Sequence, residues 1–381
     1  MKRKIAVLGA TGSIGSQSLQ VINEFKDVFE ISLATCSTRF EELSRYSKEY
    51  NIKKLGIHPA PSIDMSDKSV LKGNSDIISY INDNDIDTLL IGTSDIDSLE
   101  ILLQCYNSVK RIAISNKEVI VAAGVCGLLD EIKKSTMLVP IDSEHASVYS
   151  LLSRVEIRDV KKVIITASGG PIYSRHDSDY DISNISPQEA LSHPVWNMGK
   201  KVTIDSATLF NKGIEIMEAK YLFDLNKDMI SVVIHPESII HAMLEMYDGF
   251  VLSAMAMPDM RIPIQYSLLF PQYPWNEITK KINFLNLSKI TFRSLDPEKI
   301  TSIKLAYECL EKGNIYPLVY LAADEIAVNK YLNGEIALCD INTIVSEALY
   351  IIEPISNISS YNIIDMYKNI QIKIRKVVDK L

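Results

Sequence analysis

Short apolar runs alternate with helical stretches through the first 150 residues, and this alternation is the strongest constraint on how the chain can fold. After the first run, apolar residues recur at helical spacing from Ile14 to Phe25. Strands that alternate with helices form parallel sheets that helices cover on both faces. We therefore predict an α/β, doubly wound N-terminal domain. Its strands are expected at residues 4–9, 29–35, 88–92, 111–115 and 137–141.

A glycine-rich turn, GATGSIG, joins the first predicted strand to the first predicted helix. Gly9, Gly12 and Gly15 recur every three residues. Glycines at this point let backbone N–H groups approach a pyrophosphate at the helix N-terminus, as in Rossmann-like domains. A plain tight turn is the alternative, because glycine turns are common. The position of this turn in the first strand–helix unit favours a dinucleotide cofactor.

The end of the second predicted strand indicates which dinucleotide binds. Sites that select NAD carry an Asp or Glu about 20 residues after the glycine turn. Here the strand ends in ATCSTR, which has no carboxylate but offers Ser37, Thr38 and Arg39. Hydroxyl groups and a guanidinium suit the 2′-phosphate of NADP. The alternative is that these three residues form an ordinary solvated loop end.

The pattern changes after residue 150. Residues 172–200 are polar and lack periodicity, so we expect a long lid or binding loop there. Three strands follow between 231 and 257, and Asp248-Gly249 supplies a hairpin turn. The last helix, 363–381, carries apolar residues at spacings of three and four, as in a helical bundle.

A chain of 381 residues exceeds what one hydrophobic core usually supports, so we expect several domains. The predicted parts are a cofactor-binding domain at 1–142, a catalytic and connective α/β domain at 143–260 with its flap at 172–200, a linker at 261–298 and a C-terminal α-helical bundle at 299–381.

The composition excludes several classes of protein. A net charge of −8 argues against a general binder of nucleic acid or anionic membranes. No apolar run reaches the ~20 residues that a membrane helix needs. The five cysteines lack CxxC spacing, which is typical of reduced cysteines. The N-terminus MKRKIAVLG enters a strand without a signal-peptide pattern, so we expect a cytoplasmic protein.

Two carboxylates stand one residue apart in the stretch VPIDSEHAS. On an extended chain Asp142 and Glu144 would point the same way. The alternative is that Asp142 caps a helix over 143–152 and Glu144 lies in its first turn. Like charges this close repel, so they need either solvent or a positive partner.

The stretch DSATLFNKGIEIMEA, residues 205–219, favours a positive partner. We predict one helix there, with Asn211 and Lys212 next to Glu215 on one face and Ser206 nearby. Carboxylate oxygens from two elements form a hard site for Mg²⁺ or Mn²⁺. The serine, amide and ammonium groups suit a phosphate. We therefore expect a divalent cation and a phosphorylated substrate.

The same residues carry a resemblance to a known family. The motifs GATGSIG, SNKE, PIDSEH, SGGP, HPVWNMGKKVTIDSATLFNKGIE and HPESIIH occur in order along nearly the whole chain. In these motifs the chain resembles the 1-deoxy-D-xylulose 5-phosphate reductoisomerases. The resemblance implies an NADPH-dependent, metal-requiring oxidoreductase and isomerase of non-mevalonate isoprenoid biosynthesis. It also implies a homodimer that forms through the sheet of the central domain.

The resemblance implies a role for each matching residue. The metal ligands would be Asp142, Glu144 and Glu215, and Lys117 and Glu144 would be catalytic. Substrate would contact Ser143, Ser168, His193, Trp196, Ser206, Asn211, Lys212 and His241. Cofactor would contact Thr11, Gly12, Ser13, Ile14, Cys36, Ser37, Thr38, Arg39, Asn116, Glu118, Met198 and Gly199.

The chain departs from the family's usual pattern in two places. Cys36 stands where the family usually has glycine, and residues 92–99, GTSDIDSL, are more polar than the usual Gly- and Ala-rich version. His235 could contact substrate, as His241 could, and the alternative is a strand histidine that its neighbours satisfy. We expect His145 to be structural and not a metal ligand, because hard oxygen sites rarely use imidazole.

The implied reaction rearranges the carbon skeleton of 1-deoxy-D-xylulose 5-phosphate and then reduces an aldehyde, which gives 2-C-methyl-D-erythritol 4-phosphate. A plain NADP-dependent dehydrogenase of a phosphorylated small molecule is the first alternative, and it would need no carboxylate trio. A non-catalytic nucleotide-sensing protein is the second, and its cofactor affinity would not depend on metal.

Overall fold

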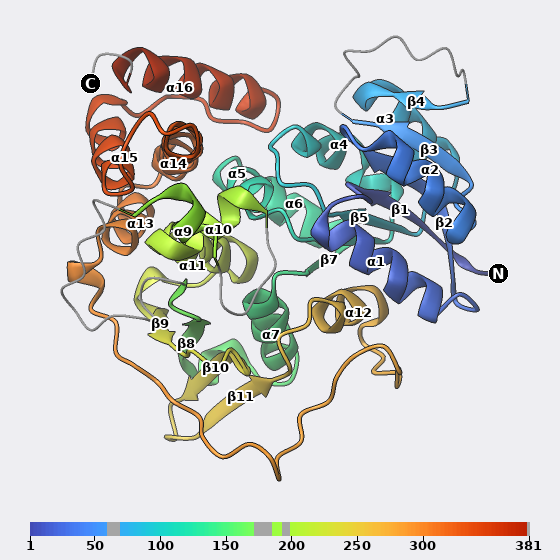
Figure 1. Ribbon diagram of the computed structural model, residues 1–381, viewed down its shortest axis with the longest axis horizontal. Coiled ribbons are helices and arrows are strands. Elements are labelled where there is room, and N and C mark those ends of the chain that lie inside the picture. The colour runs from blue at the N-terminus through green and yellow to red at the C-terminus, as the bar shows by residue number, and fades with distance from the viewer. Residues whose placement is uncertain (59–68, 171–184, 193–198, 379–381) are drawn as a thin grey trace. The chain divides into compact units, whose positions relative to one another are not determined.

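The computed structural model describes residues 1–58, 69–170, 185–192 and 199–378 (Figure 1). The chain forms two compact units. The first unit contains residues 1–119, 128–149 and 259–281. The second contains residues 120–127, 150–258 and 282–381. In the described part of the chain, no helix is long and apolar enough to cross a membrane.

A parallel sheet forms the centre of the first unit, as the alternating pattern predicted. Its strand order is β4-β3-β2-β1-β5-β6-β7, and every neighbouring pair is parallel. The order runs outward from β1 in both directions, so the chain reverses its course between β1 and β5. In doubly wound sheets ligands bind at such a point, outside the carboxyl ends of the strands. The strands are β1 (Arg3–Leu8), β2 (Phe29–Cys36), β3 (Lys54–Ile57), β4 (Leu71–Lys72), β5 (Thr88–Ile91), β6 (Arg111–Ile114) and β7 (Met137–Pro140).

Helices pack on this sheet and complete its core. Ile5, Val7 and Leu90 from the strands are fully buried beside Leu19 of α1. This burial of apolar side chains is the main force that holds strand and helix together. The helices of the unit are α1 (Ser13–Glu24), α2 (Phe40–Glu49), α3 (Gly73–Asp83), α4 (Ser98–Cys105), α6 (Leu128–Ser135), α12 (Arg261–Leu269) and a 3₁₀ turn at Tyr106–Ser108. The unit boundaries fall inside two further helices, α5 (Lys117–Val125) and α7 (Ser143–Leu152).

Helix α12 corrects one prediction, because it forms where we expected the linker to begin. It packs against α1 and contributes Ile264 and Leu268 to the core of the first unit. Pro263 lies in its first turn, where no backbone N–H is needed for a helical bond. Arg111 donates to the carbonyls of Ser267 and Phe270 at the other end, at 2.7 and 2.5 Å. The other predicted domain boundaries stay predictions.

The second unit is built around a mixed sheet of order β11-β10-β8-β9. β8 is parallel to β9 and antiparallel to β10, and β10 is antiparallel to β11. The predicted hairpin joins β10 and β11, and Gly249 takes the positive φ of 93° that its turn requires. The strands are β8 (Val160–Ala167), β9 (Ile230–Ile234), β10 (Ile240–Met246) and β11 (Val251–Met255).

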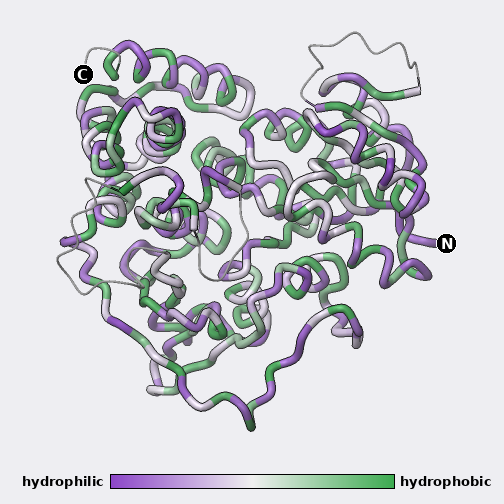
Figure 2. Tube along the Cα trace, in the orientation of Figure 1, coloured by the Kyte–Doolittle hydropathy of each residue, from purple (hydrophilic) through white to green (hydrophobic). Residues whose placement is uncertain are grey.

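The helices of the second unit include the predicted C-terminal bundle. In α16, Ile363, Tyr367, Ile370 and Ile374 are buried, and α16 packs against α14. Figure 2 shows hydrophobic and hydrophilic residues alternating along α16, as its spacing predicted. The helices are α9 (Pro187–Ala190), α10 (Lys200–Thr208), α11 (Phe210–Phe223), α13 (Thr301–Lys312), α14 (Tyr316–Leu332), α15 (Asp340–Ile351) and α16 (Ile363–Val378), with 3₁₀ turns at Ile157–Asp159, Lys227–Met229 and Pro297–Lys299.

The helix predicted over 205–219 is wrong in one respect, because the chain breaks it into α10 and α11. Leu209 sits between them with φ 62° and ψ 12°, the left-handed region that leucine rarely adopts. Its side chain is buried, and burial of an apolar side chain is favourable. Ser206 therefore lies on α10, while Asn211, Lys212 and Glu215 share α11.

Candidate active site

The glycine turn after β1 brings α1 unusually close to the strand. A Cβ atom on Gly15 would lie 2.1 Å from the carbonyl oxygen of Gly9, so no larger residue fits there. Gly9 itself has φ 77° and donates its N–H to Thr35 Oγ1 at 3.2 Å. Such close packing of helix and strand is the role of the third glycine in a dinucleotide-binding turn, so the geometry is compatible with the predicted cofactor.

The first turn of α1 follows directly from this glycine turn. Gly12 is the N-cap residue and provides no side-chain cap, and its N–H bonds to the Gly9 carbonyl at 2.9 Å. The N–H groups of a first helical turn lack intrahelical partners and favour an anion. Thr11 is buried, whereas Ser13 is exposed and Ile14 is half-buried. All four residues lie at the start of α1, and their contacts with the cofactor stay predictions.

The residues predicted to hold the 2′-phosphate follow β2. Cys36 ends the strand and is buried, and this burial raises the pKa of its thiol to about 11. Ser37 and Thr38 are exposed. The Arg39 side chain is 57% exposed and pairs with Glu42 at 3.1 Å. Two hydroxyl groups and one exposed guanidinium are therefore open to solvent at the carboxyl end of β2.

Asn116 connects the loop after β5 to the start of α5. Its Oδ1 accepts the N–H of Val119 at 3.0 Å, and its Nδ2 donates to the Asp95 carbonyl at 2.6 Å. Glu118 lies half-buried in the first turn of α5. The positions of Asn116 and Glu118 at a sheet edge are compatible with the predicted cofactor contacts.

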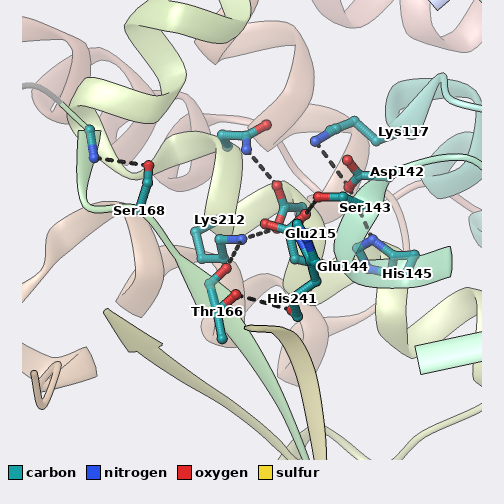
Figure 3. Close-up of polar contacts among 12 residues, drawn as sticks. Lys117, Asp142, Ser143, Glu144, His145, Thr166, Ser168, Lys212, Glu215 and His241 are labelled. Atoms are coloured by element: carbon teal, nitrogen blue, oxygen red, sulfur yellow. Dashed lines mark hydrogen bonds and ion pairs between the residues drawn. The ribbon is translucent and has the colours of Figure 1, made fainter. Parts of the chain in front are cut away.

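Asp142 anchors a polar cluster in the first unit (Figure 3). Lys117 Nζ lies 3.3 Å from Asp142 Oδ2, and His145 Nδ1 lies 3.1 Å from the same oxygen. Ser143 donates its hydroxyl to Glu144 at 2.5 Å. Lys117 and Asp142 are mostly buried, with side chains 10% and 15% exposed. A buried carboxylate is stable only with such a positive partner.

The backbone at Asp142 and Glu144 is the start of a helix and not an extended strand. Asp142 directly precedes α7, and its carbonyl accepts the N–H of Ala146 at 2.8 Å. Glu144 lies in the first turn of that helix. The helix-start alternative is therefore correct for the backbone, and the helix dipole there favours negative charge.

A second polar cluster lies on α11 in the second unit (Figure 3). Glu215 is buried and accepts hydrogen bonds from Asn211 and Lys212, the two neighbours that the helical spacing predicted. Lys212 Nζ also donates to the carbonyl of Thr166, near the end of β8, at 2.5 Å. This ammonium is thereby fixed between the helix and the sheet.

Three further predicted residues lie at the same end of β8. Ser168 accepts the N–H of Gly170 at 3.3 Å. A Cβ on Gly170 would lie 2.6 Å from the Ser206 carbonyl, so this turn touches the end of α10.

His241 is buried, and its Nε2 contacts the Ala256 carbonyl at 3.3 Å. Its backbone carbonyl accepts from Thr166 Oγ1 at 3.1 Å. The second unit thus gathers serine, amide and ammonium groups around the end of β8.

Some predicted site residues belong to neither of these two clusters. His193, Trp196 and Met198 lie outside the described residues, as does most of the predicted flap. Gly199 is described and is the N-cap residue of α10. His235 has neighbours that satisfy its ring, because its Nε2 accepts the Ile239 N–H at 3.1 Å and its Nδ1 contacts the Thr291 carbonyl at 2.9 Å.

A buried ionic cluster that holds α10 was not predicted from the sequence. Lys201 donates to Asp205 at 2.7 Å and to Asp324 of α14 at 2.6 Å. The separation of 123 residues between Lys201 and Asp324 hides this contact from any local pattern. The i, i+4 spacing of Lys201 and Asp205 was the one signal that could have indicated it.

Three family models match the chain. A model described as 1-deoxy-D-xylulose 5-phosphate reductoisomerase matches residues 5–124. Models described as C-terminal domains of the same enzyme match residues 138–223 and 255–377. Together they follow the order of the motifs along the chain.

Named relatives and solved structures agree with these models. The reductoisomerase of Sulfurihydrogenibium sp. (strain YO3AOP1) is 41% identical over 91% of this chain and 90% of its own length. That of Thermoanaerobacter pseudethanolicus is 39% identical over 98% and 99%. The Zymomonas mobilis enzyme in complex with NADPH superposes with a TM-score of 0.89 at 30% identity, over 100% of both chains. A reductoisomerase complex with NADPH, fosmidomycin and magnesium gives 0.87 at 29% identity, over 99% and 98%. The chain therefore belongs to the 1-deoxy-D-xylulose 5-phosphate reductoisomerase family.

Proposed function

We propose that the protein converts 1-deoxy-D-xylulose 5-phosphate to 2-C-methyl-D-erythritol 4-phosphate with NADPH and a divalent cation, a step of non-mevalonate isoprenoid biosynthesis. The observation that carries this proposal is the relation to named reductoisomerases over 98% of this chain and 99% of the relative. Solved relatives of similar fold hold NADPH and magnesium. The site residues named below are assigned on chemistry and on the family's motifs.

NADPH is the proposed hydride donor, and the residues of the first unit fit it. Gly15 lets α1 pack closely against the Gly9 carbonyl, where a Cβ would clash, and the first turn of α1 offers N–H groups to the diphosphate. Ser37, Thr38 and Arg39 are exposed at the end of β2, where the 2′-phosphate of the cofactor is expected.

Asp142, Glu144 and Glu215 are the proposed ligands of Mg²⁺ or Mn²⁺. Their donor atoms are carboxylate oxygens, which are the ligands that hard divalent cations prefer. Lys117 pairs with Asp142, and Lys212 pairs with Glu215. Asp142 and Glu215 therefore each have a cationic partner within their own unit. When bound, the cation supplies Lewis-acid polarisation of substrate oxygens.

The substrate phosphate is assigned to Ser168, Ser206, Asn211 and Lys212. These groups are hydrogen-bond donors from the end of β8, from α10 and from α11. Lys212 is buried and fixed by the Thr166 carbonyl, so its charge is preorganised for an anion. Phosphate contacts far from the reacting carbons can provide binding energy for orientation of the substrate.

Lys117 and Glu144 are the proposed catalytic residues, and Ser143 and His241 are assigned to substrate. Lys117 is the proposed proton donor to a substrate oxygen. Asp142 Oδ2 lies 3.3 Å from its Nζ and keeps the ammonium in place. Glu144 accepts a hydrogen bond from Ser143 and can accept a proton there. His193, Trp196 and Met198, outside the described residues, keep their assignments from the family motif.

We also propose a homodimer in the cytoplasm. The β10–β11 hairpin exposes Tyr247, Phe250 and Val251, and β11 is an edge strand of its sheet. Exposed apolar side chains beside an open strand edge suit a protein partner. Five free cysteines are in keeping with a reducing compartment.

One assay tests the proposed reaction and separates the alternatives. NADPH oxidation is followed with deoxyxylulose phosphate, first with EDTA and then with added Mn²⁺ or Mg²⁺. We expect oxidation only with metal, and methylerythritol phosphate as the product. A product with an unrearranged carbon skeleton would identify a plain dehydrogenase. NADPH binding without any metal-dependent oxidation would identify a nucleotide-sensing protein.

A further inference from the structure

The loop after β5 borders the expected cofactor position in the first unit. A Cβ on Gly9 would lie 3.1 Å from the backbone of Gly92 and 3.1 Å from Thr93 Cγ2. The glycine turn and residues 92–93 are therefore in direct contact at the carboxyl ends of β1 and β5. In this chain the loop continues as TSDIDS, which has hydroxyl and carboxylate groups.

A buried histidine lies beside this loop. His58 follows β3, its side chain is fully buried, and its backbone N–H donates to the Cys36 carbonyl at 2.9 Å. Its Nδ1 is hydrogen-bonded to Oδ1 of Asn74 on α3, whose amide nitrogen donates to Glu100 on α4. A carboxylate only accepts, so the amide of Asn74 is oriented with its oxygen toward the ring. His58 Nδ1 therefore carries a hydrogen.

The other ring nitrogen of His58 lacks a hydrogen-bond partner among the described residues. Its Nε2 is buried and points toward Asp95, with 3.8 Å to Oδ1. If His58 Nε2 carried no proton, this nitrogen and the Asp95 carboxylate would be two hydrogen-bond acceptors facing each other, which is unfavourable for both groups. A proton on Nε2 would instead form an ion pair with Asp95.

Asp95 determines the conformation of the loop. Its Oδ1 accepts the N–H of Asp97 at 3.1 Å. Its carbonyl accepts from Asn116 Nδ2 at 2.6 Å and from Ser98 Oγ at 3.3 Å. Asn116 in turn binds the N–H of Val119 at the start of α5. A change in the partner of Asp95 therefore acts on the loop and on Asn116, a proposed cofactor residue.

Within the described residues, several carboxylates lie near His58, and Lys72, which pairs with the neighbouring Ile57 in the sheet, is a cation on the adjacent strand β4. Asp95 and Asp97 lie on the loop, Glu100 lies on α4, and the Cys36 thiol at the end of β2 has a raised pKa and stays neutral. Burial raises the pKa of the Asp95 carboxyl, and His58 opposes this shift. The Asp95 side chain is still 42% exposed, so solvent reaches it. An anionic ligand at this edge would add further negative charge.

We propose that His58 and Asp95 are positioning residues for the cofactor, and that NADPH binding places a proton on His58 Nε2. The diphosphate and 2′-phosphate bring several negative charges to the sheet edge, which favours the protonated ring. The His58–Asp95 ion pair then fixes the loop and Asn116 against the bound cofactor. This inference rests on the proposed use of NADPH, and it concerns residues outside the family's motifs quoted above.

Calorimetry of NADPH binding tests the proposal without turnover. NADPH is titrated into the full-length protein without substrate or metal, at several values between pH 6 and pH 8.5. Buffers of different ionisation enthalpy reveal how many protons accompany binding. We expect the wild type to take up more protons than His58→Gln, by as much as about one, and its affinity to fall more steeply with pH, by up to ~10-fold per unit. The variant also corrects for protons exchanged by the cofactor phosphates.

Two carboxylate variants provide the matched comparison. Asp95→Asn removes the partner of His58 and should abolish the same excess proton uptake, while Asp97→Asn removes a charge from the same loop and should preserve it. Because Asp95 is half-exposed, its variant should fold even where His58→Gln does not. Equal proton uptake in the wild type and Asp95→Asn would overturn the inference. Absence of NADPH binding in the wild type would instead refute the proposed function.

Discussion

Glu215 is a buried carboxylate whose neighbours on α11 are an amide and an ammonium. We expect Glu215→Gln to reduce turnover by at least ~100-fold, because the amide lacks the charge that a metal ligand needs. Calorimetry should show weakened Mn²⁺ binding, with NADPH affinity unchanged. Glu308→Gln, on α13 of the same unit, is the control. Full turnover of the Glu215 variant would remove this residue from the proposed ligand set.

Arg39 is the one cation at the end of β2 in the predicted cofactor-specificity segment, residues 36–39. We expect Arg39→Gln to reduce kcat/KM with NADPH by about 10- to 100-fold, as for loss of a charge-assisted hydrogen bond. Activity with NADH should change little. Glu42→Gln is the matched variant, because it removes the present partner of Arg39 and should slightly favour NADPH. Equal losses with both cofactors after Arg39→Gln would contradict a role in binding the 2′-phosphate.

Local spacing predicted some side-chain contacts of the candidate site and not others. Asn211 and Glu215 are four residues apart on one helix, so their contact follows from helical geometry. For Asp142 and Glu144, the same two residues fit an extended chain or a helix start, and the sequence did not decide between them. His58 and Asp95 come from different strand ends, so their approach depends on the packing of α3 and α4.

Helix α10 is held by a buried ionic cluster that contains one lysine and two carboxylates. Lys201 bonds to Asp205 of the same helix and to Asp324 of α14. We expect Lys201→Met to destabilise the protein by about 3–5 kcal/mol, because two buried carboxylates lose their cation. Asp324→Asn should be milder, since Lys201 keeps Asp205. Chemical denaturation measures both variants.

The order of these two effects is the informative result. If Asp324→Asn destabilises the protein more than Lys201→Met, the cation is not what holds the cluster together. The exposed pair Lys304–Glu298 provides a control in the same unit, and Glu298→Gln should leave the denaturation midpoint unchanged.

The elements that the sequence predicted well are those with long, regular patterns. β1, β2, α1 and α16 follow directly from apolar runs or helical spacing. The four-residue strand β3 and two-residue β4 carry no such pattern and were missed. The break at Leu209 also has no local signal, because neither glycine nor proline marks it. That leucine is buried in the folded unit, and such a tertiary environment leaves no mark in the local pattern.

The hairpin of the second unit presents the apolar surface that bears on assembly. Tyr247 and Phe250 are 71% and 73% exposed, and Val251 of β11 is 52% exposed. Within the described residues, β11 has one neighbour, β10, so its other edge offers unpaired backbone groups. A two-fold axis beside this strand would cover both the edge and the aromatic side chains in one self-complementary interface.

Sedimentation equilibrium tests this arrangement on the full-length protein. We expect the wild type to sediment at twice the 42.8 kDa mass of one chain. Phe250→Asp should shift the equilibrium toward the monomer, because dimerisation would bury an unpaired carboxylate. Tyr361→Asp changes an aromatic residue that is 98% exposed and lies far from the hairpin in the sequence, so its dimer should persist. A monomeric wild type would refute the proposed homodimer, and a dimer unaffected by Phe250→Asp would move the interface away from β11.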